Sequence, residues 1–176
     1  VPYFINDSGT NDIPGTIEFD VVRQSFATWE NVATSTIAFS DRGLTTASAG
    51  YIDGLNIMEF VSDPDSEFGR MMTPGLLGVT LLTFSTITGE MLDADIIFND
   101  IHTVFSATEE TNAFWTISAT GELTLGGVVN LPNIAVHEIG HFCGLGHSFI
   151  DGVLQSVVFD DVTGAYYYPN PDPVLK

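Results

Sequence analysis

The sequence predicts an α+β domain, in which helices and strands are mixed without the regular strand–helix alternation of a parallel α/β fold. Strand-like segments occupy much of the first hundred residues, and one long amphipathic segment interrupts them. A composition of 44% hydrophobic residues, with 13 Phe, is typical of a packed core. The chain has 176 residues and shows no internal repeat or obvious linker, so we expect a single domain over residues 1–176.

The first elements follow from the hydrophobic pattern. Residues 1–6 read as a short strand, closed by a cluster of turn-forming residues at 6–9. A helix is expected over residues 16–34, because Val22, Phe26 and Trp29 recur at three- and four-residue spacing. Two further strands are predicted at 36–40 and 55–61, followed by a long loop with two Pro and two Gly at 62–76.

A hairpin is predicted next, with arms at residues 77–85 and 91–98 and a turn around 86–89. In the second arm every other residue is apolar, and the residues between them, which point to the opposite face, include Asp93 and Asp95 near the start of the arm. Such alternation predicts a strand buried on one face only.

The last third of the chain contains one strong helix signal. Residues 99–129 are polar and show no clear period. Asn130 is a suitable N-cap, Pro132 falls in the first turn, and Gly144 can adopt the left-handed conformation that ends a helix. We therefore expect a helix over 131–143 and a short final helix over 160–167, before two prolines.

The charge of the chain excludes several classes of partner. Four Lys and Arg stand against 23 Asp and Glu, which gives a net charge of −19. No basic stripe exists to neutralise phosphates, so we expect no nucleic-acid partner and no docking on anionic membranes. No apolar run approaches the roughly 18 residues that a membrane span needs. A single cysteine, Cys143, excludes an internal disulfide, and we expect a monomer.

Three of the four histidines lie within eleven residues, in the pattern H-E-x-x-H-x-x-G-x-x-H. On a helix His137 and His141 point the same way and can hold one zinc ion, and a turn at Gly144 brings back His147 as third ligand. Three nitrogen ligands leave a fourth position open for water, which is typical of a catalytic zinc site. Glu138 lies about 100° around the helix, where it can act as general base towards a zinc-activated water. An ordinary helix with histidines would explain neither the glycine nor the third histidine.

This pattern resembles the signature of the metzincin zinc proteases. Ser148 after the third histidine is similar to the matrixin branch, which includes bacterial members. Residues 26–32, 88–99 and 160–164 also resemble that family's first helix, its fifth strand and the opening of its last helix. The resemblance implies a zincin-like fold with a twisted five-stranded mixed sheet, a long helix, an active-site zinc helix and a short C-terminal helix. It also implies a secreted enzyme, and residues 1–4 lack the basic and apolar regions of a signal peptide.

Two departures from the family are visible. Metzincins place a methionine turn beneath the zinc, but all four methionines here precede the motif, and Leu154, Gln155 or Val158 would take that place. Animal matrixins hold a second, structural zinc with several histidines, whereas only His102 lies outside the motif here. Calcium is a candidate structural ion, although a solvated acidic surface explains the same carboxylates equally well: Asp63, Asp65, Glu67, Asp93, Asp95 and Asp100.

The expected function is a zinc endopeptidase in which Glu138 is the general base and His137, His141 and His147 hold the metal. A polypeptide substrate would pair with the edge strand at 77–85. The resemblance implies that Val136 and the segment after His147 help line the pocket beyond the cut bond, and their mainly apolar side chains favour apolar residues there. One alternative is a catalytically weak or inactive zinc-binding pseudoprotease that binds peptides. Another is a zinc hydrolase of non-peptide amides. Cys143, Phe26 and Trp29 are expected in the core, and Tyr166, Tyr167 and Tyr168 against the last helix.

Overall fold

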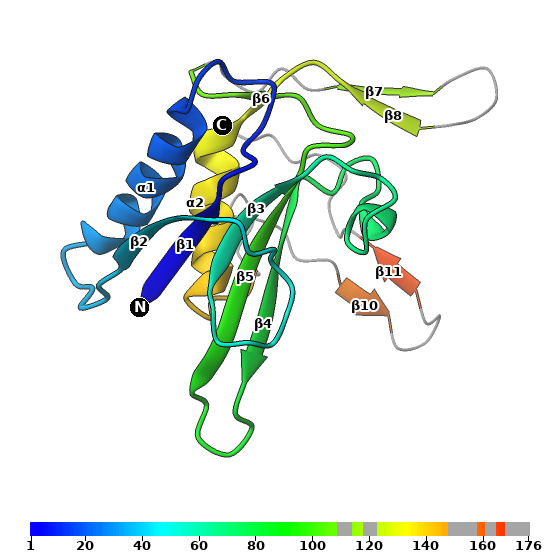
Figure 1. Cartoon of the computed structure of the whole chain (residues 1–176). Helices are drawn as coiled ribbons and strands as arrows, with labels where there is room; N and C mark the ends of the chain where they lie inside the picture. Colours follow the sequence, from blue (N-terminus) through cyan, green and yellow to red (C-terminus); the bar gives the residue numbers. More distant parts are fainter. Residues whose placement is uncertain (109–113, 118–122, 148–157, 161–164, 168–176) are drawn as a thin grey trace. The chain divides into compact units, whose positions relative to one another are not determined.

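The computed structural model describes residues 1–108, 114–117, 123–147, 158–160 and 165–167 (Figure 1). The chain divides into two compact units, Val1–Gly144 and Leu145–Lys176. The first unit contains a five-stranded sheet and both long helices, as an α+β fold requires. The expectation of one domain over residues 1–176 stays a prediction. Among the described residues, no helix has the length and apolar character needed to cross a membrane.

The sheet is mixed, as predicted, and its strand order is β2-β1-β3-β5-β4. Neighbouring strands are parallel except for β4, which runs antiparallel to β5 at the edge of the sheet. The predicted hairpin 77–98 is therefore present and supplies this edge strand. The five strands are β1 (Pro2–Asn6), β2 (Ser40–Thr45), β3 (Ile57–Val61), β4 (Gly78–Phe84) and β5 (Met91–Asn99).

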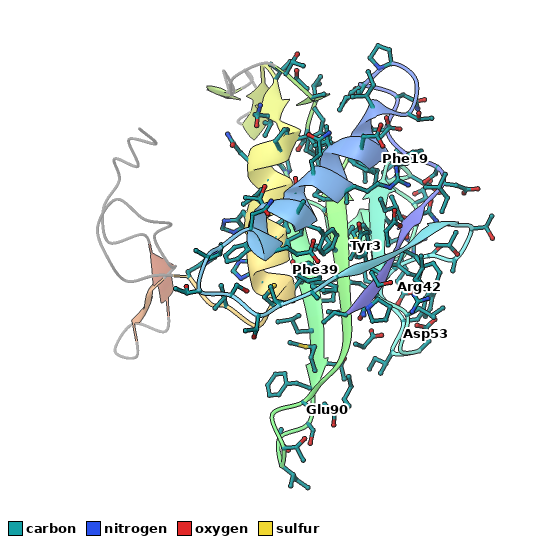
Figure 2. The ribbon with its side chains drawn as sticks, turned by 90° about the vertical axis from the view of Figure 1, so that its left-hand side faces the viewer. Tyr3, Phe19, Phe39, Arg42, Asp53 and Glu90 are labelled. Carbon is teal, nitrogen blue, oxygen red and sulfur yellow. The ribbon has the colours of Figure 1, made fainter. Side chains whose placement is uncertain are left out.

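Helices α1 (Ile17–Glu30) and α2 (Leu131–Phe142) cover one face of the sheet (Figure 1). Phe26, predicted as a core residue, stacks on Tyr3 of β1 with ring centroids 3.9 Å apart, and it meets Phe142 of α2 edge-on at 5.5 Å. Phe39 also contacts Phe26, at 4.8 Å, and Figure 2 shows Tyr3 and Phe39 on the helix side of the sheet. This aromatic cluster ties both helices to the sheet.

The opposite face of the sheet is also covered, which contradicts the prediction of a half-buried second hairpin arm. From Asp93 to Asn99 every residue of β5 is buried. The segment between β2 and β3 lies over this face, and Asp95 accepts hydrogen bonds from the backbone N–H groups of Gly50, at 2.6 Å, and Ile57, at 2.7 Å. Acidic side chains thus face the protein interior because backbone donors satisfy them.

The strand predicted at residues 36–40 is displaced to β2 at Ser40–Thr45. The apolar side chain that suggested a strand, Phe39, instead packs against Phe26 and Phe142. The N–H of Phe39 donates to Glu30 Oε1 at 2.6 Å, so this backbone is held outside the sheet. Tertiary packing therefore overrides the local strand preference.

Short elements occupy two segments that carried no clear pattern. The loop 62–76 contains a single 3₁₀ turn, η1 (Gly69–Met71). In residues 99–129, β6 pairs parallel with β9, and β7 pairs antiparallel with β8. These four strands are β6 (Phe105–Ser106), β7 (Phe114–Ile117), β8 (Leu123–Gly126) and β9 (Val129–Asn130).

The prediction of a final helix at 160–167 is wrong. Its described residues form two antiparallel strands, β10 (Val158–Asp160) and β11 (Ala165–Tyr167). Phe159, Tyr166 and Tyr167 are aromatic residues that favour strands over helices. Tyr166 and Tyr167 therefore belong to a strand, and Tyr168 lies outside the described residues.

Candidate metal centre

The helix that carries the first two histidines begins where the sequence predicted, at Leu131, and ends one residue earlier than predicted, at Phe142. The Asn130 side chain accepts a hydrogen bond from the N–H of Asn133 at 3.1 Å and so caps the N-terminus. At the other end Gly144 has φ +85°, and its N–H donates to the carbonyl of His141 at 2.7 Å. This left-handed residue ends the helix three positions before His147.

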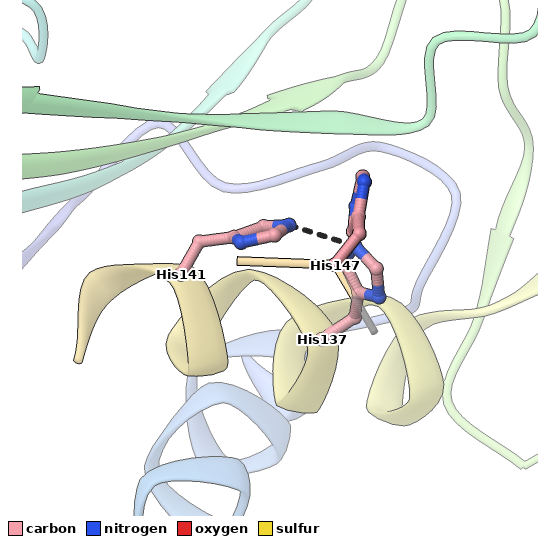
Figure 3. Close-up of side chains that lie close together, drawn as sticks. All are labelled: His137, His141 and His147. Atoms are coloured by element: carbon pink, nitrogen blue, oxygen red, sulfur yellow. Dashed lines mark hydrogen bonds between the residues drawn. The ribbon is translucent and has the colours of Figure 1, made fainter. Parts of the chain in front are cut away.

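The three predicted ligand side chains come together (Figure 3). His137 and His141 lie one helical turn apart, with their Nε2 atoms 3.1 Å from each other and their rings nearly perpendicular, at 84°. One ring nitrogen from each of His137, His141 and His147 falls within a group whose atoms all lie within 4.8 Å of one another. Three converging imidazole nitrogens are a donor set that suits zinc.

Two of these histidines are half-buried and the third is exposed, so solvent reaches the cluster. Among the described residues, this is the one group of three or more His, Cys, Asp or Glu side chains arranged to hold a metal ion. His102, the remaining histidine, is outside it. The histidine cluster therefore fits a zinc site that is open on one side.

Glu138 follows the first histidine in the chain, but its side chain is turned towards the sheet. Its Oε2 accepts a hydrogen bond from the Thr80 hydroxyl of β4 at 2.6 Å, and the same hydroxyl lies 3.0 Å from the Glu138 backbone carbonyl. Glu138 is 5% exposed. Burial raises the pKa of this carboxyl above its usual value, while the Thr80 hydrogen bond and the charge of His141 oppose the shift.

The sequence alone identified neither Thr80 nor Gly78, two residues earlier on β4, as a residue that lies against Glu138. A Cβ atom on Gly78 would lie 3.1 Å from Cγ and Oε1 of Glu138, closer than ordinary packing allows. The only local signal was the predicted edge strand itself. A glycine and a threonine on such a strand form no recognisable motif, so no sequence pattern could have found this contact.

Helix α1 supports the zinc helix from its other side. Trp29 donates its indole N–H to the carbonyl of Val136 at 2.8 Å, and Gly140 lies against the Trp29 ring. Cys143 is half-buried against the same core, close to the expected buried position. Of the positions considered for the methionine turn, Leu154 and Gln155 lie outside the described residues, and Val158 begins β10.

The carboxylates considered for calcium serve other contacts. Asp95 and Asp93 accept backbone N–H groups, the latter from Gly54 at 2.9 Å, and Asp100 accepts the Thr10 hydroxyl at 2.6 Å. Burial raises the pKa of Asp95 and of Asp100 to about 6. The remaining three candidates are exposed: Asp63, Asp65 and Glu67.

Comparison with known proteins identifies the family. No curated protein matches the chain. The family model for matrixin matches residues 2–165, a range that spans the whole sheet, both helices and the three clustered histidines. The chain therefore belongs to the matrixins, a family of zinc-dependent metalloproteases.

Proposed function

We propose that this chain is a zinc endopeptidase in which His137, His141 and His147 hold the metal and Glu138 is the general base. The observation that carries the proposal is the convergence of three imidazole nitrogens within 4.8 Å, with the buried Glu138 next to His137 in the chain. Membership of the matrixin family supports it and implies that peptides are the substrates.

His137, His141 and His147 would hold the ion through one ring nitrogen each, and three protein ligands are typical of a catalytic zinc site. A zinc ion held there would supply Lewis-acid chemistry, that is, polarisation of a carbonyl oxygen and activation of water. Exposure of His147 leaves this side of the cluster open to substrate and solvent.

Glu138 then handles the proton. Its carboxylate accepts the proton of the attacking water and passes it to the leaving amine. Burial raises the pKa of Glu138 above its usual value, which makes the carboxylate a stronger base than an exposed glutamate. The Thr80 hydroxyl occupies Oε2, so Oε1 is the oxygen that remains for this transfer.

Strand β4 offers the docking edge for a polypeptide. Among the described strands it is the outermost of the sheet and pairs only with β5, so we expect its other edge to bind an extended peptide backbone. Val136 is half-buried on the zinc helix and supplies an apolar wall, so we expect a preference for apolar residues beyond the cut bond.

The test is cleavage of an unfolded protein such as casein by the purified chain. Four conditions are compared: the wild type, the wild type with chelator, the chelated protein with zinc restored, and Glu138→Gln. We expect the wild type to cleave casein, the chelator to abolish this cleavage and added zinc to restore it. Glu138→Gln should show no cleavage. One zinc bound per chain without cleavage of any peptide would overturn the endopeptidase and favour the peptide-binding pseudoprotease. Cleavage of non-peptide amides without cleavage of peptides would favour the alternative of a zinc hydrolase that acts on non-peptide amides.

A structural calcium ion, a monomeric state and secretion belong to the same proposal. Support for calcium is electrostatic: Asp12 and Glu18 repel the charge of the buried Asp100, although these carboxylates are not arranged as a ready ligand group among the described residues. A divalent cation would relieve this repulsion. Thermal unfolding with and without millimolar calcium tests the ion, light scattering tests the monomer, and fractionation of producing cells tests secretion.

A further inference from the structure

We propose that Thr80 is a positioning residue for catalysis: its hydroxyl holds one oxygen of the Glu138 carboxylate against strand β4 and leaves the other free for proton transfer. This inference rests on the proposed function, because it assigns a role to a neighbour of the general base.

The hydrogen-bond geometry defines which oxygen is held. The Thr80 hydroxyl has a single hydrogen to donate, and two acceptors of Glu138 compete for it. The carboxylate Oε2 is at 2.6 Å and the backbone carbonyl at 3.0 Å. The shorter contact to a charged acceptor is the stronger one, so the hydrogen points to Oε2. Among the described residues only Thr80 donates to this carboxylate, at Oε2, so Oε1 keeps its acceptor capacity for a reacting water.

The strand that carries Thr80 is a rigid support. Thr80 is paired in register with Ile96 of β5, whose side chain is fully buried. Two residues earlier, Gly78 provides the space that the carboxylate occupies, because a Cβ there would press on Cγ and Oε1 at 3.1 Å. Alternate residues of a strand share a face, so Gly78 and Thr80 together form one seat for Glu138.

The burial of Glu138 explains why its carboxylate needs this support from Gly78 and Thr80. Glu138 is 5% exposed, and a buried carboxylate without a donor is costly to keep in place. If the hydroxyl is removed, Oε2 must find water or another donor, and the side chain can rotate away from its productive position. A catalytic base that is displaced by about 1 Å loses rate without loss of substrate binding.

The test compares Thr80→Val, which keeps the shape but removes the hydroxyl, with Thr80→Ser, which keeps the hydroxyl. Thr28→Val is the matched control, because the Thr28 hydroxyl contacts only its own helix, at Gln24. For Thr80→Val we expect kcat on a fluorogenic peptide to fall roughly 10- to 100-fold, because a misplacement of a catalytic group by about 1 Å can cost this much. KM and bound zinc should stay unchanged, and Thr80→Ser should recover most of the rate. A kcat for Thr80→Val equal to that of the control would overturn the inference.

A second readout does not depend on activity. Urea unfolding of the metal-free protein is measured for Thr80→Val, for Glu138→Ala and for the double variant. If the hydroxyl acts on the carboxylate, Thr80→Val should lower the urea midpoint less in the Glu138→Ala background than in the wild type, because the backbone carbonyl is then the only acceptor left at residue 138. Additive shifts would show that the contact does not form and would refute the inference. An inactive wild type would instead overturn the proposed function, and the catalytic role of Thr80 with it, even where the unfolding shifts are coupled.

Discussion

Gly140 lies between the two helical histidines, and its substitution by alanine should destabilise the protein even though alanine is the better helix former. A Cβ at this position would lie 2.9 Å from Cζ2 and 3.4 Å from Cη2 of the Trp29 ring. The ring cannot move aside freely, because its N–H is hydrogen-bonded to the carbonyl of Val136 at 2.8 Å. The new methyl group therefore meets a rigid and anchored surface.

Two opposing effects set the size of the change. Replacing glycine by alanine inside a helix gains about 0.5–1 kcal/mol, because the unfolded chain loses conformational freedom. Overpacking of a well-packed contact costs about 1–3 kcal/mol. Moving the Trp29 ring away would also weaken a hydrogen bond worth about 0.5–1.5 kcal/mol. We expect Gly140→Ala to lower the free energy of unfolding by about 1–2 kcal/mol on these magnitudes.

Urea unfolding of the metal-free protein measures this change, and a second background tests its cause. In Trp29→Leu, the ring atoms that meet the new methyl group are gone. The same Gly140→Ala change should then be neutral or should stabilise the helix by up to about 1 kcal/mol. A wild-type background in which Gly140→Ala leaves stability equal or higher would refute the reasoning, because it would show that α1 and α2 adjust without cost.

Three further substitutions test the N-cap of helix α2, the buried carboxyl group of Asp100 and the ion pair between Arg23 and Asp41. Asn130→Ala removes the side-chain acceptor of the Asn133 N–H and should cost about 1 kcal/mol in urea unfolding, so an unchanged midpoint would show that the cap contributes nothing. Burial raises the pKa of Asp100 to about 6, so its contribution to stability is fully present below about pH 4 and is lost as the pH rises through 6. Asp100→Asn should therefore flatten the decline in melting temperature between pH 4 and 6 in calcium-free buffer, and an undiminished decline would assign it to other groups. Arg23→Met breaks the exposed ion pair with Asp41 and should cost less than about 1 kcal/mol, a difference that 1 M salt should abolish.

The zinc helix was predictable because its signals are local. Asn130, Pro132 and Gly144 act within a few residues of the helix ends, and the structure places the helix at Leu131–Phe142 against the predicted 131–143. The hairpin at 77–98 was equally clear, since turn formers separate two arms of strand-like residues. The clustering of the three histidines also follows from spacing along one short segment.

Features that depend on distant parts of the chain were not predictable. The contact between Thr80 and Glu138 joins residues 58 positions apart, and neither residue type marks it in advance. The local sequence around Phe39 favours a strand, but the Phe39 side chain instead packs against Phe26 and Phe142. Asp95 looked exposed because carboxylates usually are, but the backbone donors that bury it come from residues 50 and 57. In each case a tertiary partner decided the outcome.

The order of the elements along the chain has a consequence for synthesis of the protein. All five strands of the central sheet lie within residues 2–99, and the zinc helix begins only at Leu131. Because a nascent chain emerges from its N-terminus, the sheet can assemble while the histidines are still inside the ribosome. During that interval the chain lacks the metal-binding segment. The metal-binding site can therefore form only after the sheet that supports it. Metal binding is delayed until translation of this region is nearly over.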